Sequence, residues 1–260
     1  MNTSALVNTI HNACRQNRRI TVANYNIHAF NLSLHLPWFQ HFLQQAEIAH
    51  CDGRGILTAL RWLNMETAKD DRVSYSDLMP KLLDRANQES WSVFLLGTKP
   101  DHLALALTNL RQQYPNATFN GHHGYFQIDS ALENAAIVDQ INQARPQLLI
   151  VGMGMPIQER WISDHRDQLH TNAILPGGAV IDRFAGVVSD CPKWLSDNSL
   201  EWCYRFAQEP RRLATRYLLG NPAFLLQIAL AKFQSVAGMG NQILWHHPVT
   251  EAEILAAALP

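Results

Sequence analysis

Short apolar runs bounded by Gly, Pro or Asp recur along the chain and predict buried β-strands. They occupy residues 20–23, 46–51, 92–96, 148–153 and 173–175. Between these runs, apolar residues recur at spacings of three and four, which predicts helices over residues 75–88, 100–114, 130–144 and 158–169. Because strands and helices alternate, we predict an α/β fold with a mostly parallel sheet flanked by helices, a Rossmann-like core.

The composition changes near Pro192, and the residues that follow are helix-forming, aromatic and basic. We therefore expect a core over residues 1–191 and a helical, basic C-terminal appendage with a tail over residues 192–260. With 260 residues, of which 47% are hydrophobic, the chain can bury a substantial core without a disulfide or a structural metal.

Charge and cysteine usage narrow the cellular context. The formal net charge of -1 gives no overall attraction to nucleic acid, so we expect no nucleic-acid partner. Four scattered cysteines without a CxxC pair indicate neither zinc nor redox chemistry and suit a reducing cytoplasm. The sequence shows no secretion signal and no apolar run near the roughly 18 residues of a spanning helix, so we predict a cytoplasmic chain without a transmembrane span.

Polar residues and glycines follow the predicted strands. In a parallel sheet, ligands bind beyond the carboxyl ends of the strands, so these segments predict where a site lies. They are residues 24–26, 52–55, 97–99, 152–158 and 177–182.

Asp52 is the strongest catalytic candidate. It stands at a predicted strand end directly before Gly53 and close to Gly55, where little side-chain bulk blocks a ligand. Such a carboxylate can act as a general base that deprotonates a sugar hydroxyl while a nucleotide diphosphate departs, and a positioned base contributes about 10²–10⁴-fold to a rate. The competing interpretation is an Asp that closes a turn or caps a helix.

A turn at residues 97–99 is a candidate for phosphate contacts. Gly97 ends a predicted strand and Lys99 precedes a predicted helix, so backbone N–H groups and a lysine would meet an anion there. The GxxxxGK[ST] spacing is absent, and an ordinary turn between strand and helix explains the segment as well.

A second turn, at residues 152–158, is more informative. Gly152 and Gly154 end a predicted strand and are followed by the polar pair Gln158 and Glu159. The segment invites a dinucleotide-binding interpretation, but the GxGxxG spacing fails at Ile157, which argues against an NAD site.

A departing diphosphate needs positive charge nearby. No DxD sequence occurs, and neither His122-His123 nor His246-His247 has the spacing of an HExxH zinc site, so we predict no metal and no cofactor. Arginines are the candidate counter-charges, because a guanidinium group binds phosphate through two hydrogen bonds. Those of the appendage lie among aromatic residues, which fits attachment to a membrane surface and equally fits packing on the core. They include Arg205, Arg211, Arg212 and Arg216.

Several ordered segments together resemble the WecG/TagA/CpsF family of bacterial glycosyltransferases over roughly residues 20–222. The resemblance implies a metal-independent, inverting transfer from a UDP-sugar to an undecaprenyl-diphosphate-linked glycan at the cytoplasmic face of the membrane, in cell-surface or exopolysaccharide synthesis. The segments that carry it are VSYSDLMPKLL (73–83), FLLGTKP (94–100), GHHGYF (121–126), GMGMPIQERWI (152–162), GGAVIDRFAG (177–186) and the stretch at 191–217.

By position, the resemblance assigns Asp52 as the catalytic base. The residues expected to bind the substrates are Asn24, Asn26, Ser76, Asp77, Gly97, Lys99, Gly152, Gly154, Gln158, Glu159, Gly178, Asp182, Arg205, Arg211 and Arg212.

Three positions depart from the family pattern. Asn24 stands where the family often has Thr, Tyr75 replaces a small residue, and Arg183 occupies an often apolar position. Family donors carry N-acetylmannosamine, its uronic acid, glucose or glucuronic acid, so these departures leave the donor sugar open. Some relatives form homo-oligomers, but the sequence does not choose an oligomeric state, and residues 223–260 carry no functional interpretation.

Two other functions stay open. One is a sugar-nucleotide oxidoreductase or epimerase, against which the missing GxGxxG spacing argues. The other is a non-catalytic, membrane-associated assembly factor that uses the basic appendage as an adaptor.

Overall fold

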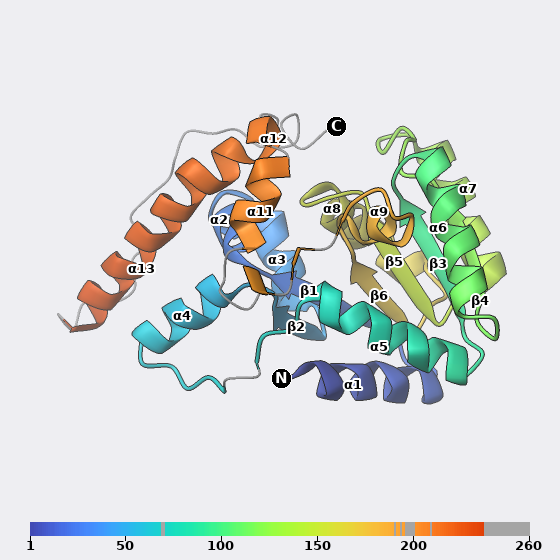
Figure 1. The fold of residues 1–260 in the computed structure, drawn as a ribbon, viewed down its shortest axis with the longest axis horizontal. Coiled ribbons are helices and arrows are strands. Elements are labelled where there is room, and N and C mark those ends of the chain that lie inside the picture. The colour runs from blue at the N-terminus through green and yellow to red at the C-terminus, as the bar shows by residue number, and fades with distance from the viewer. Residues whose placement is uncertain (69–70, 190, 193, 196–200, 209, 237–260) are drawn as a thin grey trace.

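In the computed structural model, six parallel strands form one sheet in the order β2-β1-β6-β5-β3-β4 (Figure 1). The structure describes residues 1–68, 71–189, 191–192, 194–195, 201–208 and 210–236. The predicted α/β fold with a parallel sheet is confirmed. The strands are β1 (Ile20–Tyr25), β2 (Ile48–Cys51), β3 (Ser92–Gly97), β4 (Thr118–His122), β5 (Leu148–Gly152) and β6 (Ala173–Pro176).

Helices connect the strands and continue after the sheet is complete. They are α1 (Thr3–Arg15), α2 (Ile27–His35), α3 (Pro37–Gln45), α4 (Arg54–Trp62), α5 (Tyr75–Gln88), α6 (Pro100–Gln113), α7 (Ala131–Ala144), α8 (Ile157–His165), the 3-10 turn η1 (Arg166–Gln168), α9 (Val180–Phe184), α11 (Glu201–Gln208), α12 (Pro210–Ala214), the π-helical turn η2 (Thr215–Leu219) and α13 (Gly220–Val236).

The five predicted strands are confirmed as β1, β2, β3, β5 and β6, whereas β4 was not predicted. β4 lies at the edge of the sheet, and of its residues only Phe119 is buried. An edge strand with one buried side chain does not produce the continuous apolar run by which buried strands are recognised.

Side chains alternate between the two faces of the sheet. Ile150 and Leu95 belong to a core shared with α1, α5, α6 and α9. Val151 and Leu96, one position further along, belong to a second core shared with α3, α7 and α8. This period of two is the expected property of strands buried on both sides. Because all the strand pairs are parallel, the carboxyl ends of the strands lie at one common edge of the sheet.

The helices from α11 to α13 form a C-terminal helical segment beside α2 and α4 (Figure 1). Phe224 and Ile228 of α13 pack in one cluster with Ile56 of α4, and the Phe224 ring meets the edge of Phe30 at a centroid distance of 5.1 Å. Within the described part of the chain, no helix is long and apolar enough to cross a membrane.

Candidate active site

Asp52 extends β2 at the carboxyl edge of the sheet. Its backbone N–H donates to the carbonyl of Tyr25 in β1 at 3.2 Å, and Asn24 Nδ2 donates to Asp52 Oδ2 at 3.3 Å. Arg72 Nε donates to the Asp52 backbone carbonyl at 3.0 Å. The N-cap of α4 is Gly53 and it makes no side-chain capping bond, so the interpretation of Asp52 as a helix cap is wrong.

Buried polar atoms without hydrogen-bond partners gather near Asp52. Among the described residues, no partner exists for Tyr75 Oη, for Asn24 Oδ1 or for Glu159 Oε2. The His50 and Tyr75 rings meet edge to face at a centroid distance of 5.6 Å. Since buried polar groups nearly always find partners, this part of the edge is exceptional.

Electrostatics connects these groups. Burial raises the pKa of Tyr75 well above its usual value, and the negative charges of Asp52 and Glu159 raise it further. Burial lowers the pKa of His50, an effect that the Asp52 charge and the backbone at Val73 partly oppose. Tyr75 therefore lies within electrostatic reach of both acids.

Glu159 is the most deeply buried acid of the site, with 1% of its surface exposed. Burial raises its pKa from 4.5 to about 7, although hydrogen bonds from Gln158 and from its own backbone, together with the charge of Arg216, act in the opposite direction. Burial and the same Arg216 charge lower the pKa of His28 to about 3. The C-terminal helical segment thus carries a positive charge to the edge of the core through Arg216, one of the arginines that the sequence analysis named as candidate counter-charges.

Gln158 ties two turns of the site together. Its Oε1 accepts hydrogen bonds from the backbone N–H groups of Gly154 at 3.1 Å and Gly178 at 2.9 Å, and its Nε2 donates to Glu159 Oε1 at 2.8 Å. These bonds join the turn after β5 to the turn after β6. The structure therefore brings four of the predicted residues into one hydrogen-bonded unit.

The turn after β3 needs glycine. A Cβ at Gly97 would lie 2.3 Å from the carbonyl oxygen of Gly152, because β3 and β5 approach closely at these paired residues. Lys99 follows as the exposed N-cap of α6, which is the position predicted for an anion contact.

Asp182 lies at the start of α9 and contacts residues that the sequence analysis missed. Its Oδ1 accepts a hydrogen bond from Thr98 Oγ1, and His102 Nδ1 lies 2.8 Å from the same oxygen. Nothing in the local sequence signals this contact, because Asp182 is 84 positions from Thr98 and 80 from His102 along the chain.

Two predicted binding residues take part in the hydrogen bonds that begin helices. The Asn26 side chain accepts from the Ala29 N–H at 3.0 Å and begins α2. Asp77 accepts from the Ser74 hydroxyl at 2.7 Å, and its own N–H donates back to Ser74 at the start of α5. These capping bonds account for both residue types without a ligand.

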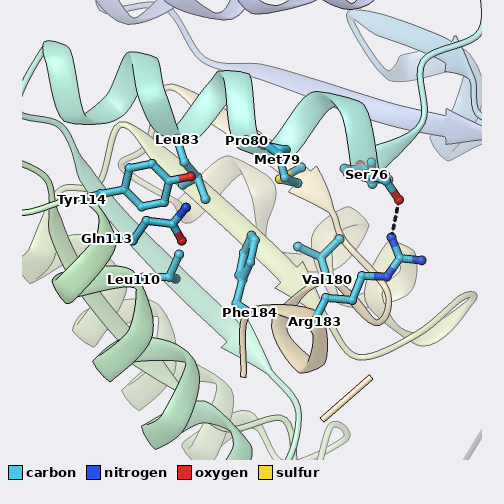
Figure 2. Close-up of a pocket in the computed structure, with 11 residues that line it drawn as sticks. Ser76, Met79, Pro80, Leu83, Leu110, Gln113, Tyr114, Val180, Arg183 and Phe184 are labelled. Atoms are coloured by element: carbon cyan, nitrogen blue, oxygen red, sulfur yellow. Dashed lines mark hydrogen bonds between the residues drawn. The ribbon is translucent and has the colours of Figure 1, made fainter. Parts of the chain in front are cut away.

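Ser76 lies at a cavity of about 160 Å³ between α5, α6 and α9, which Tyr75 also lines (Figure 2). Its hydroxyl accepts a hydrogen bond from Arg183 Nη1 at 2.8 Å, and Arg183 is drawn reaching toward α5 in Figure 2. The rest of the lining is mostly apolar and includes Met79, Leu83, Leu110 and Phe184.

Three predicted arginines belong to the C-terminal helical segment. The backbone of Arg205 lies in α11 and those of Arg211 and Arg212 lie in α12, but their side chains are outside the described part of the structure. Among the residues described, no three His, Cys, Asp or Glu side chains are grouped as metal ligands are.

A parallel α/β sheet with a carboxylate, glycine turns and a cation at its carboxyl edge is the arrangement of an α/β enzyme that binds a small ligand there. The sequence matches the glycosyl transferase WecG/TagA/CpsF family over residues 1–237. The chain belongs to this family and is a glycosyltransferase.

Similar proteins include the N-acetylglucosaminyldiphosphoundecaprenol N-acetyl-beta-D-mannosaminyltransferases of Staphylococcus aureus strains MW2 and NCTC 8325. Each is 33% identical to this chain over 194 residues, which cover 75% of this chain and 73% of the relative. Family membership favours the transferase over the oxidoreductase and the non-catalytic assembly factor.

Proposed function

We propose that the chain transfers an N-acetylmannosamine-type sugar from a UDP-sugar to an undecaprenyl-diphosphate-linked sugar, with inversion at the anomeric carbon. The names of the relatives support the acceptor and the transferred sugar. The observation that carries the mechanism is Asp52, a carboxylate at the carboxyl edge that is not used as a helix cap and whose Oδ2 accepts a hydrogen bond from Asn24 Nδ2.

In the proposed reaction Asp52 removes the proton from the acceptor hydroxyl. The freed oxygen attacks the anomeric carbon of the donor, the bond from that carbon to the diphosphate oxygen breaks, and UDP leaves with the bonding electrons. Attack from the face opposite the leaving group inverts the configuration. Asn24 orients the carboxylate, because its amide donates to Asp52 Oδ2.

The charge on departing UDP requires cations and N–H donors. Lys99 is exposed where α6 begins, so the lysine and the helix N-terminus are proposed to meet the diphosphate. Arg216 supplies a further positive charge near Glu159. Arg205, Arg211 and Arg212 stay proposed phosphate contacts on the strength of the family resemblance.

We propose that the uridine of the donor binds at the carboxyl edge of the sheet, near the ends of β3 and β4. Tyr125 follows β4 with 48% of its surface exposed, and the neighbouring Gly124 donates its N–H to the Thr98 carbonyl at 2.9 Å. An exposed aromatic ring beside the candidate site offers a stacking face for a base. We propose that Tyr125 takes this role.

Peripheral attachment to the inner membrane at its cytoplasmic face is proposed for the C-terminal helical segment. Its exposed apolar side chains support this, because a membrane surface would bury them. The proposed lipid-linked acceptor lies in the same bilayer. They are Trp202, Leu218, Leu219, Leu225, Leu226 and Phe233.

Vesicle binding tests the attachment. The double variant Leu225→Asp/Leu226→Asp is expected to bind anionic vesicles at least tenfold more weakly, since burying one leucine contributes about 1.5–3 kcal/mol. Leu132→Asp is the matched control, because Leu132 is 83% exposed on α7, outside the segment. Equal binding by all three proteins would contradict the attachment.

The reaction is tested by UDP release from a panel of UDP-sugars with a polyprenyl-diphosphate-linked N-acetylglucosamine acceptor. We expect acceptor-dependent release that is fastest with UDP-N-acetylmannosamine and unchanged by a metal chelator. UDP release only from a glucose-type UDP-sugar would show that the transferred sugar is of the glucose type and not N-acetylmannosamine. A folded protein that releases no UDP from any donor and does not bind UDP would contradict the proposed function.

A further inference from the structure

A triangle of hydrogen-bonding side chains lies where α9 meets the turn after β3. His102 Nδ1 is 2.8 Å from Asp182 Oδ1 and 3.5 Å from Thr98 Oγ1, and the Thr98 hydroxyl donates to the same Asp182 oxygen. The other oxygen, Asp182 Oδ2, makes no hydrogen bond within the described residues. The Asp182 side chain is 24% exposed, so the carboxylate that carries this second oxygen is accessible to solvent.

The backbone holds this triangle firmly. Thr98 has a φ of 55°, which β-branched residues rarely adopt. Its N–H donates to the Gly152 carbonyl at 3.2 Å, and its carbonyl accepts from the Gly124 N–H at 2.9 Å. The turn is thereby fixed to the end of β5 and to the residues after β4, and unusual backbone conformations persist where surroundings determine them in this way.

The hydrogen-bonding roles within the triangle follow from the chemistry of the groups. An ionised carboxylate only accepts hydrogen bonds, so the nitrogen of His102 that faces Asp182 carries the proton. The other ring nitrogen, Nε2, lies 3.9 Å from Asp101 Oδ2. Because Nδ1 keeps its proton in the neutral tautomer and in the charged ring alike, His102 holds Asp182 in both states.

We propose that His102 is a positioning residue for donor binding: it holds Asp182 so that the free carboxylate oxygen accepts hydrogen bonds from hydroxyl groups of the nucleotide-sugar. This inference rests on the proposed function. A carboxylate repels the diphosphate of the donor, whereas hydroxyl groups are uncharged donors that an acceptor-only oxygen fits. Both the ribose and the transferred sugar carry such hydroxyls.

Calorimetric titration of UDP into the purified chain and its variants tests the proposal. His102→Ala is expected to bind UDP roughly tenfold more weakly, the effect of losing one hydrogen bond to a charged group. His102→Asn is expected to stay within about threefold of the wild type, because its amide N–H can replace the Nδ1–H. His41→Asn is the matched control, since His41 is an exposed histidine on α3.

The same comparison in steady-state assays separates positioning from folding. A positioning role raises KM for the UDP-sugar and leaves kcat and the acceptor KM unchanged. If the hydroxyls belong to the ribose, UDP affinity and donor KM change together. If they belong to the transferred sugar, only the donor KM changes, and either pattern supports the role of His102.

A double-mutant cycle with Asp182→Asn shows whether His102 acts through Asp182. We expect His102→Ala to cause little further loss of donor binding in the Asp182→Asn background, because both substitutions disrupt the same hydrogen-bonded pair. Should His102→Ala fail to fold, Thr98→Val removes the second donor to the same oxygen and replaces it in the cycle.

The inference is overturned if His102→Ala matches the wild type in both UDP affinity and donor KM, or if the two losses are additive. It is also overturned if the asparagine variant is as impaired as the alanine variant. When the wild type binds UDP in these experiments, such results leave the proposed function standing. A wild type that binds no UDP and transfers no sugar would overturn both.

Discussion

The two halves of the carboxyl edge differ in how completely their polar groups are paired. Near Asp182, hydrogen bonds from Thr98 and His102 fix the carboxylate. Near Asp52, the buried Tyr75 hydroxyl and Asn24 Oδ1 have no partner among the described residues. A paired half is preorganised for binding, whereas unpaired groups in a dry environment interact strongly with any charge that forms beside them.

Gln158 and Glu159 mark the boundary between the halves although they are neighbours in sequence. The Gln158 amide oxygen accepts from both Gly154 and Gly178, and its nitrogen donates to Glu159. The second oxygen of Glu159 has no partner among the described residues. Gln158 therefore stabilises the turns at the carboxyl edge, while Glu159 is a buried acid with a raised pKa.

Gln158→Met is expected to produce a large loss of stability. It leaves two backbone N–H groups without their acceptor, at about 1–3 kcal/mol each, so the free energy of unfolding should fall by roughly 3 kcal/mol. Denaturant unfolding measures this, with the exposed Gln40→Met on α3 as the control. Equal midpoints for the two variants would show that the bonds do not hold the turns.

Glu159→Gln is expected to remove a dependence of stability on pH. The folded protein keeps the Glu159 proton up to a pKa of about 7, whereas the unfolded chain releases it near 4.5, so the folded state binds more protons in between. Wild-type stability should therefore fall by about 3 kcal/mol as pH rises through this window. The variant should lack this fall.

Unfolding curves at pH 5 and pH 8 measure the difference between the two proteins. The exposed Glu66→Gln serves as the control and should keep the wild-type slope. A wild type whose stability is the same at both pH values would contradict the buried proton.

Asp182→Asn is expected to weaken UDP binding about tenfold, since an amide is a poorer acceptor than a carboxylate. The rate at saturating donor should not change, because we propose that this half binds the donor without taking part in proton transfer. Titration of UDP and steady-state kinetics measure both quantities. A variant that loses turnover while binding UDP normally would reverse the roles of the two halves.

Tyr75→Phe is expected to have the smallest effect on stability, within about 1 kcal/mol, because the removed hydroxyl has no partner in the described structure. Tyr75→Ala, which also removes the buried ring, should cost about 3–5 kcal/mol. Thermal unfolding compares them. A large loss in the phenylalanine variant would mean that the hydroxyl is hydrogen-bonded in solution.

Much of the fold could be predicted because buried parallel strands leave continuous apolar runs. The run at residues 148–153 predicted β5, whereas the edge strand β4 buries only Phe119 and left no such signal. Helix α5 was predicted over its full length, because its apolar residues follow the helical period up to Gln88.

The site was predictable only in part, because sequence order shows which residues follow strands and not which side chains meet. Asp52 and Asp182 both follow strands, and the sequence predicted them as site residues for that reason; these assignments stay predictions. The contact of His102 with Asp182 and the charge of Arg216 near Glu159 join distant segments, so tertiary packing alone reveals them. Asn26 also follows a strand, yet its side chain caps α2, and Asp77, assigned from the family resemblance, bonds to Ser74, the N-cap of α5.

The most direct test of the central claim is the rate of one round of sugar transfer by Asp52→Asn, with donor and acceptor saturating and UDP affinity measured on the same protein. The substitution keeps an acceptor for the Asn24 amide but cannot take a proton. We predict a rate about 10²–10⁴-fold below that of the wild type, with UDP affinity within about twofold. Transfer at a rate near that of the wild type would contradict Asp52 as the catalytic base.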